Sequence, residues 1–248
     1  MNLAIVTGTT KGLGAALRDV LAADANNLVI TLSRAATTIP ANATTAINFN
    51  LDMSDLAAIE AVFAAVTARI SDQKFDRALL INNAGVVSPV GAFDQISAAE
   101  TGHNLIVNLA APMILAQLFA LSTRQIATQR LIVNISSGAA KRAVAGWSAY
   151  CAAKAGLEMA TRVAALEAST IDPTLSICSL APGVVDTDMQ AMIRGTNKKQ
   201  FPDVTRFQAM KADGALRDTH SVATEIIALV AGGRLTNGGN FDIRELTQ

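Results

Sequence analysis

The chain has 248 residues, a length at which α/β architectures commonly form one unit, so we expect a single domain over residues 1–248. Hydrophobic residues make up 51% of the sequence and charged residues 16%, which supplies a large core and excludes disordered and fibrous classes. Equal numbers of basic and acidic residues give a net charge of +0, so no overall field draws the chain to nucleic acid or to an anionic membrane. A small molecule is the expected partner.

Short apolar runs alternate with longer stretches of helical period along the chain. The runs are continuous rather than alternating, which is typical of strands buried on both faces of a parallel sheet. We expect strands at Leu3–Thr7, Leu28–Leu32, Ala46–Phe49, Ala78–Asn82, Leu131–Ile135, Leu175–Leu180 and Asn240–Ile243, and helices at Gly12–Ala23, Asp55–Ile70, Ala98–Thr123, Ala149–Ala168 and Thr219–Val230. This succession predicts an α/β fold with a three-layer, doubly wound parallel sheet of Rossmann type and about seven strands.

One segment, at about 184–214, breaks this rhythm because it mixes Met, Phe, Lys and Gly without a clean period. Long insertions in compact domains are usually lids or binding loops, so we expect an excursion over a substrate site. A surface insertion without a role is the alternative.

The chain offers few metal ligands and no export signal. Its two cysteines, Cys151 and Cys178, do not form a C-x-x-C pair, and it has two histidines, so we expect no metal site. No basic segment or cleavage site accompanies the first apolar run, which predicts a cytoplasmic protein. The most apolar stretch, residues 105–121, contains Asn108 and is expected to be a core helix rather than a membrane span.

A glycine-rich turn follows the first expected strand. Residues 7–14 read Thr-Gly-Thr-Thr-Lys-Gly-Leu-Gly and lead into an Ala- and Leu-rich helix. Glycines let a backbone approach a pyrophosphate, and the first N–H groups of the helix supply partial positive charge. The pattern differs from G-x-x-x-x-G-K-[ST], which disfavours a nucleoside-triphosphate loop. A merely tight turn is the alternative to a dinucleotide site. That site would be formed by Gly8, Thr10, Lys11, Gly12, Leu13 and Gly14.

The end of the second strand is where such a site distinguishes its two nicotinamide cofactors. An acid there binds the ribose 2′-hydroxyl of NAD(H), whereas a base accepts the 2′-phosphate of NADP(H). Here the strand ends in Ser33 and Arg34, with no acid before Asp52, and Lys11 adds a second cation. Two cations and a hydroxyl suit a dianionic phosphate, so the sequence favours NADP(H).

The only tyrosine of the chain, Tyr150, stands one helical turn before Lys154, so both side chains share a helix face. An ammonium group beside a phenol is expected to lower a pKa that begins at about 10. Such a tyrosine can exchange a proton with a carbonyl or an alcohol. Ser137, after an expected strand, could bond the same substrate oxygen. Alone, the Tyr-x-x-x-Lys pattern is common and usually marks an exposed helix face.

As a set, these motifs resemble the short-chain dehydrogenase/reductase family from end to end. The matching pieces are Thr7-Gly8 with Gly12 and Gly14, Asn82-Asn83-Ala84-Gly85, Asn108, Ile135-Ser136-Ser137, Tyr150 with Lys154, and Pro182-Gly183. The resemblance implies the fold expected above, with the strand order 3-2-1-4-5-6-7, and the nicotinamide chemistry.

The resemblance also implies a role for each matched residue. Tyr150 would be the general acid in reduction, and Ser137 would orient and polarise the carbonyl. Lys154 would bind the nicotinamide ribose, and Asn108 would hold a water that relays protons. The remaining cofactor contacts would be Asp52 and Met53 near the adenine, Asn83, Ala84 and Gly85 in the cleft, and Pro182, Gly183, Val185 and Thr187 near the nicotinamide.

The C-terminal half is similar to sepiapterin reductases and the related bacterial reductases of benzil-type diketones. The similarity lies around Trp147 and in residues 181–190, which include Met189. In sepiapterin reductases an aspartate near the chain end binds the guanidine-like edge of the pterin, and Asp242 stands at the matching place. We therefore expect Trp147, Met189 and Asp242 to bind substrate together with Ser137 and Tyr150. Ordinary packing, or a structural aspartate, is the alternative.

Together these observations predict a cytoplasmic NADPH-dependent carbonyl reductase. The expected substrate is a vicinal dicarbonyl, either a pterin side chain or an aryl 1,2-diketone. The apolar faces of residues 98–123 and 149–168 predict a homo-oligomer, a dimer or a tetramer. The alternatives are a short-chain dehydrogenase of a steroid, sugar or simple alcohol, and a non-catalytic NADP(H)-sensing protein. The presence of both Tyr150 and Lys154 disfavours the sensor.

Overall fold

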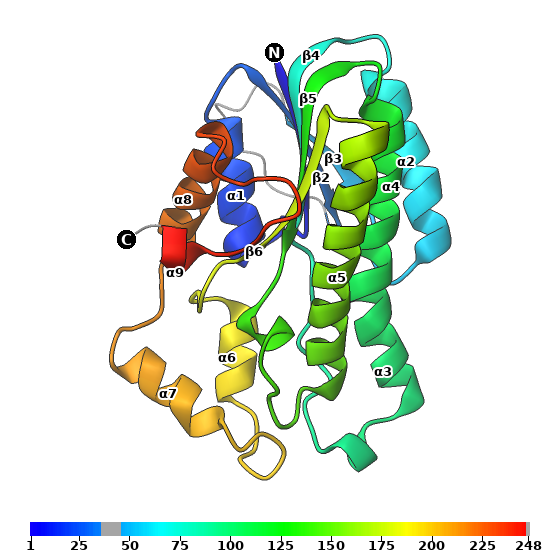
Figure 1. Cartoon of the computed structure of the whole chain (residues 1–248). Helices are drawn as coiled ribbons and strands as arrows, with labels where there is room; N and C mark the ends of the chain where they lie inside the picture. The colour runs from blue at the N-terminus through cyan, green and yellow to red at the C-terminus, as the bar shows by residue number, and fades with distance from the viewer. Residues whose placement is uncertain (36–45, 247–248) are drawn as a thin grey trace.

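The computed structural model describes residues 1–35 and 46–246, which form three layers (Figure 1). Its parallel sheet has seven strands in the order β3-β2-β1-β4-β5-β6-β7, so the predicted fold and strand order are confirmed. The strands are β1 (Asn2–Thr7), β2 (Asn27–Ser33), β3 (Ala46–Asn50), β4 (Phe75–Asn82), β5 (Ala127–Ile135), β6 (Leu175–Ala181) and β7 (Asn240–Asp242).

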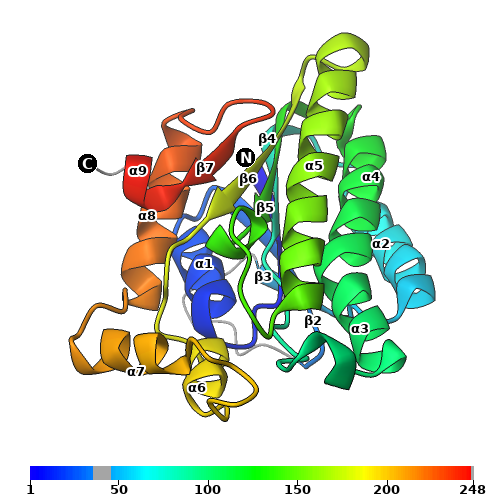
Figure 2. The same cartoon turned by 60° about the horizontal axis from the view of Figure 1, so that its bottom comes forward.

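Helices cover both faces of the sheet (Figures 1 and 2). On one face α1 (Gly12–Ala22) packs against α8 (Thr219–Ala231). On the other face lie α2 (Leu56–Ile70), α4 (Ala111–Thr123) and α5 (Ser148–Ile171). Side chains that alternate along a strand therefore enter two different cores: Leu3 and Ile5 of β1 join one, and Ala4 and Val6 join the other. This explains why the strands are continuous apolar runs in the sequence.

The predicted helix Ala98–Thr123 is not a continuous α-helix. It consists of α3 (Ala98–Leu105), a π-helical turn (Ile106–Ala110) and α4. Pro112 lacks an N–H group and cannot donate to the carbonyl of Asn108, which favours a local change of hydrogen-bond pattern. The expectation of one regular helix is therefore wrong at this point. The π-helical turn contains Asn108, which the family resemblance assigns to the site.

The same stretch, Ala98–Thr123, is long and apolar enough to cross a membrane by length and composition, and 33% of its most apolar part is buried. Core helices that pack on a sheet meet the same criterion. Here α4 contacts α2, β4 and β5, and Asn104 and Asn108 are fully buried and hydrogen-bonded inside the protein.

The segment 184–214 carries two short helices, α6 (Asp188–Arg194) and α7 (Val204–Ala212). Both lie beyond the carboxyl ends of the strands (Figures 1 and 2). Lys211 of α7 pairs with Asp186 at 2.6 Å, which ties α7 to the start of α6. The chain then returns through α8 and β7 to a last helical turn, α9 (Ile243–Leu246), beside the same end of the sheet.

Candidate active site

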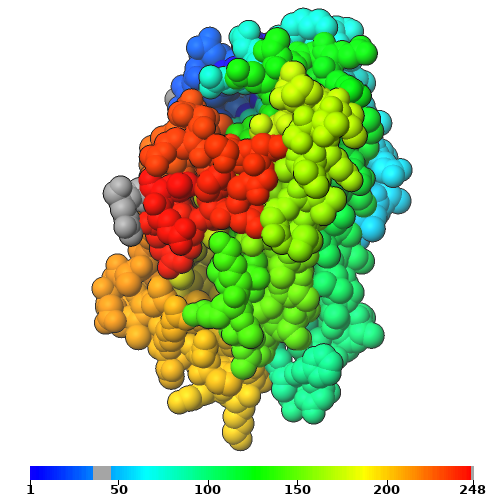
Figure 3. Space-filling model, viewed as in Figure 1, coloured from blue at the N-terminus to red at the C-terminus, as the bar shows by residue number. Residues whose placement is uncertain are grey.

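A cavity of about 610 Å³ lies at the carboxyl ends of the central strands. Figure 3 shows the hollow among the C-terminal segment in red, the segment after β5 in green and the α6–α7 segment in yellow and orange. Of the residues that the sequence assigns to the site, only Asn108 does not line this cavity. Those that line it are Gly8, Thr10, Lys11, Gly12, Leu13, Gly14, Ser33, Arg34, Asp52, Met53, Asn83, Ala84, Gly85, Ser137, Trp147, Tyr150, Lys154, Pro182, Gly183, Val185, Thr187, Met189 and Asp242.

The glycine turn between β1 and α1 has no room for side chains. Gly8 has φ +70°, and a Cβ there would lie 2.9 Å from Ala84 Cα. A Cβ on Gly14 would lie 2.1 Å from the Gly8 carbonyl oxygen. The bare backbone and the first N–H groups of α1 thus form a cradle that fits the pyrophosphate of a dinucleotide.

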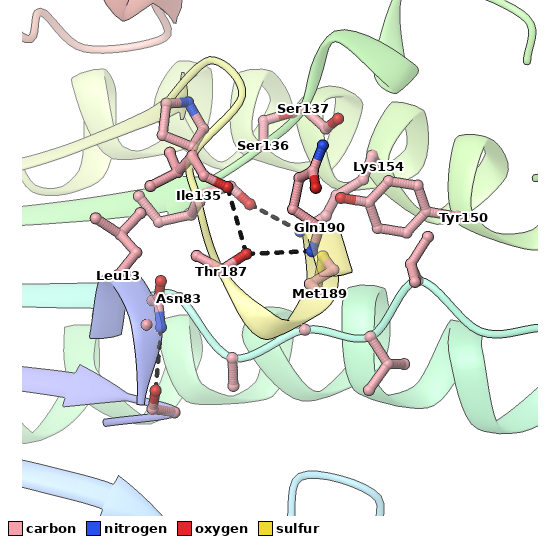
Figure 4. Close-up of a pocket in the computed structure, with 18 of the residues that line it drawn as sticks. Leu13, Asn83, Ile135, Ser136, Ser137, Tyr150, Lys154, Thr187, Met189 and Gln190 are labelled. Carbon is pink, nitrogen blue, oxygen red and sulfur yellow. Dashed lines mark hydrogen bonds between the residues drawn. The ribbon is translucent and has the colours of Figure 1, made fainter. Parts of the chain in front are cut away.

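Hydrogen bonds between β1 and the loop after β4 hold the two sides of this cradle together. Thr7 Oγ1 accepts bonds from the backbone N–H groups of Asn83 and Ala84, both at 2.9 Å. The Asn83 side chain donates to the carbonyls of Thr7 and Gly8, at 3.0 and 3.3 Å (Figure 4). The sequence identified these residues only by their resemblance to a family motif. The structure shows that their hydrogen bonds hold the cradle in shape.

The predicted phosphate-binding side chains are not equally available. Lys11 pairs with Asp188 of α6 at 2.7 Å, and both side chains are largely exposed. The Ser33 hydroxyl is buried and donates to the Ala35 carbonyl at 2.9 Å. Arg34 is exposed at the cavity edge. Arg34 is therefore the cation of this group most directly open to a ligand.

Three side chains from β5 and α5 converge at the inner end of the cavity (Figure 4). Ser137 follows β5, and its Oγ accepts a bond from the Ala139 N–H at 3.2 Å. Tyr150 and Lys154 lie on the buried face of α5, 7% and 5% exposed. The Lys154 ammonium donates to the Ile135 carbonyl at 2.8 Å and lies 5.9 Å from the centre of the Tyr150 ring.

Burial controls the proton affinity of this group. It raises the pKa of the Tyr150 hydroxyl, and a hydrogen bond with the Ser137 side chain opposes the rise. Burial lowers the pKa of Lys154 to about 8. The expected depression of the Tyr150 pKa by Lys154 is therefore not found in the ligand-free protein, where desolvation by burial is the largest cause of the shift. Tyr150 is held in its protonated form.

Asn108 lies behind the cavity and supports its wall. Its amide donates to the Val86 carbonyl at 2.8 Å and to Asn104 at 2.9 Å, and its oxygen accepts from the Val86 N–H at 3.1 Å. A Cβ on Gly85 would lie 2.8 Å from the same oxygen, so a glycine is required there. Both amide hydrogens of Asn108 are thus used within the protein.

A buried pair near Tyr150 and Lys154 escaped the sequence reasoning. Ser136 donates to the Glu158 carboxylate at 2.7 Å, and both residues are less than a tenth exposed. Glu158 is one turn after Lys154 on α5, so this bond fixes the end of β5 against the helix that carries Tyr150. Its helical spacing from Lys154 was visible in the sequence, but its pairing with Ser136 was not.

Aromatic rings wall the outer part of the cavity. Trp147 stacks on Phe201, with centroids 4.9 Å apart and planes at 9°, and meets the edge of Tyr150 at 5.5 Å. Phe207 of α7 packs against both Trp147 and Phe201. Trp147 and Met189, which the sequence predicts as substrate-binding residues, both line the cavity. Much of their surface is used in packing with the α6–α7 segment.

Asp242 is 9% exposed, and both of its carboxylate oxygens accept hydrogen bonds from the guanidinium of Arg244. These bonds lower the pKa of Asp242. No sequence pattern singled out Arg244, although it stands two positions after the predicted aspartate. Other cavity-lining residues that the sequence did not assign to the site include His103, Lys141, Arg142, Gln190, Arg206 and Glu245.

Comparison with known proteins identifies the family. The family model described as "short chain dehydrogenase" matches residues 2–198. The chain belongs to the short-chain dehydrogenase family. Benzil reductase ((S)-benzoin forming) of Bacillus subtilis (strain 168) is 36% identical over 245 residues, 99% of each chain. Sepiapterin reductase of Mus musculus is 31% identical over 196 residues, which cover 77% of this chain and 72% of the mouse enzyme.

The solved structure of the KRED1-Pglu enzyme has a TM-score of 0.83 to this short-chain dehydrogenase, with 27% identity, covering 97% of this chain and 100% of that one. The resemblance inferred from the motifs is therefore confirmed. The protein is an oxidoreductase that acts on C=O or CH–OH groups, and its family supports a nicotinamide cofactor. Among the described residues, no group of His, Cys, Asp or Glu is placed to hold a metal ion.

The lowered pKa of Lys154 predicts a titration within an accessible range. In ¹³C-lysine NMR of the ligand-free protein, the signal that disappears in Lys154→Met should titrate with a midpoint near pH 8. The folded state holds this proton less tightly than the unfolded state, so the free energy of unfolding should rise as pH increases above about 8. A midpoint at the ordinary lysine value of about 10 would contradict this account of burial.

Proposed function

We propose that this protein is an NADPH-dependent reductase of vicinal diketones, formed by residues 1–248 as one domain with residues 184–214 as its substrate loop. The observation that carries the proposal is the pair of hydroxyl groups of Ser137 and Tyr150, which line the inner end of the cavity together beside Lys154. The similarity to benzil reductases over 99% of the chain supports a diketone as substrate.

The two hydroxyl groups supply the proton and the polarisation that carbonyl reduction needs. A bound nicotinamide would supply the hydride. Tyr150, which burial keeps protonated, donates its proton to the carbonyl oxygen, and Ser137 donates a hydrogen bond to the same oxygen. The nearby Lys154 ammonium stabilises the tyrosinate that remains. Asn108 leaves one lone pair of its oxygen for the proposed proton-relaying water.

The cofactor preference rests on Arg34. It is exposed beside the cavity at the end of β2, where a 2′-phosphate would lie, and it is close enough to contribute to the lowered pKa of Asp52. Lys11 would add a second cation, because its exposed pair with Asp188 is weak and exchanges readily. These charges favour NADP(H) over NAD(H).

The remaining features fit a homo-oligomeric enzyme that acts on a small molecule. Leu121 of α4 and Leu166 of α5 are each 73% exposed on the outer helical layer. A second copy of the chain would cover such a surface. We propose a dimer or tetramer built through these helices and located in the cytoplasm.

The role of Arg34 can be tested through cofactor choice. With benzil as substrate, wild-type protein should use NADPH in preference to NADH. Arg34→Leu should raise the KM for NADPH by about ten-fold, because a charge-assisted contact to the phosphate is lost, and should leave the KM for NADH nearly unchanged. Arg69→Leu, an exposed arginine of α2, is the matched control. Equal effects on both cofactors would refute the assignment.

The role of Tyr150 can be tested by removing a single oxygen. Tyr150→Phe keeps the ring that packs against Trp147 but loses the proton that the carbonyl requires. The kcat for NADPH-dependent reduction of benzil should fall by about 10²- to 10⁴-fold, with little change in the dissociation constant of NADPH. Full turnover by this variant would be incompatible with Tyr150 as the general acid.

A further inference from the structure

The outer end of the cavity presents cations rather than acceptors. Asp242 is the buried carboxylate there, and Arg244 occupies both of its oxygens. A ligand with a donor edge, such as a guanidine-like ring, would have to share these oxygens with the internal guanidinium. The charge of Asp242 is therefore already paired within the protein.

Arg244 is held in a fixed position while its outer edge stays open. Its Cγ and Cδ atoms lie against Gly183, at 3.8 and 3.7 Å from where a Cβ would be. Asp242 uses the Nε and Nη2 groups, and the Arg244 side chain is still 61% exposed at the cavity. The guanidinium has five N–H donors, so those on Nη1 are left to bind an oxygen of a ligand.

Other cations line the same cavity. Lys141 lies close enough to Asp242 to help lower its pKa. Arg142 and Arg206 also line the cavity, and neither forms an ion pair within the described residues. Glu245 is the other acid near Arg244. The cavity is thus lined by more basic than acidic side chains, although the whole chain has a net charge of +0.

The sheet register relates Asp242 to the end of β5, which precedes Ser137. Ile135 of β5 pairs with Leu180 of β6, and Ala181 pairs with Asp242 of β7. Ser136 and Asp242 are therefore at the same height, two strand spacings apart, which is about 10 Å, and Ser137 follows Ser136 directly. At this spacing, Arg244 beside Asp242 would meet a substituent about one aromatic ring away from a carbonyl held at Ser137.

We propose that Arg244 is a specificity-determining residue that binds a carboxylate on the substrate, about one aromatic ring away from the ketone that is reduced. The inference rests on the proposed ketone reduction and narrows its substrate class to aryl ketones with an anionic far end. Asp242 acts as a positioning residue, because it fixes the guanidinium that the substrate contacts.

The test compares two substrates that differ only in this charge. The first is 4-carboxybenzil and the second is its methyl ester, both assayed with NADPH. The wild-type kcat/KM should be about ten-fold higher for the acid, which is the gain from one partly screened charge-assisted contact. In Arg244→Gln the ratio of acid to ester should fall to one or below, because the carboxylate of Asp242 then faces the substrate. Arg244→Lys, which keeps the charge but loses the planar fork, should give an intermediate ratio.

A matched control is Arg234→Gln, which removes an exposed arginine outside the cavity and should keep the wild-type ratio. A wild-type enzyme that reduces the ester as well as the acid would overturn the inference, and so would an unchanged ratio in Arg244→Gln. Unsubstituted benzil separates the two claims. If benzil is reduced while the acid gains nothing, only the Arg244 proposal fails; if none of the three compounds is reduced, the proposed reductase function fails with it.

Discussion

The site depends on one topological constraint, the reversal of strand order between β1 and β4. The chain runs outward from β1 to β2 and β3 and then returns to the other side of β1, so the turns after β1 and β4 diverge and leave a crevice. The crevice is kept narrow by Thr7, whose hydroxyl accepts two N–H groups from the loop after β4. Gly8 permits that approach, because any side chain there would meet Ala84.

Burial sets the chemistry on the other side of the crevice. The inner face of α5 carries Tyr150, Lys154 and Glu158 at helical spacing, and each contacts the end of β5 or the residues after it. The apolar surroundings favour the neutral forms of the tyrosine and the lysine. A protonated phenol beside a lysine that titrates near pH 8 is suited to donating a proton to a carbonyl. The tyrosinate that remains can then be protonated again.

The parts of this arrangement that follow from residue spacing were predictable. The strand runs, the glycine turn and the Tyr150–Lys154 pair needed only local pattern, whereas strand order followed from the family resemblance. The π-helical turn around Asn108 was not predicted, because apolar periodicity continues through it. The pairs of Lys11 with Asp188 and of Asp242 with Arg244 depend on where side chains turn after folding. The rise in the Tyr150 pKa depends on desolvation, which a sequence motif does not measure.

The central claim is that this chain transfers a hydride from NADPH to one carbonyl of a vicinal diketone. The most direct measurement uses NADPH with deuterium at the transferable position of C4, and benzil as acceptor, followed by mass spectrometry and NMR of the product. The account predicts benzoin with one deuterium on the carbinol carbon. Benzoin without deuterium, or tight binding of NADPH with no benzoin, would contradict it.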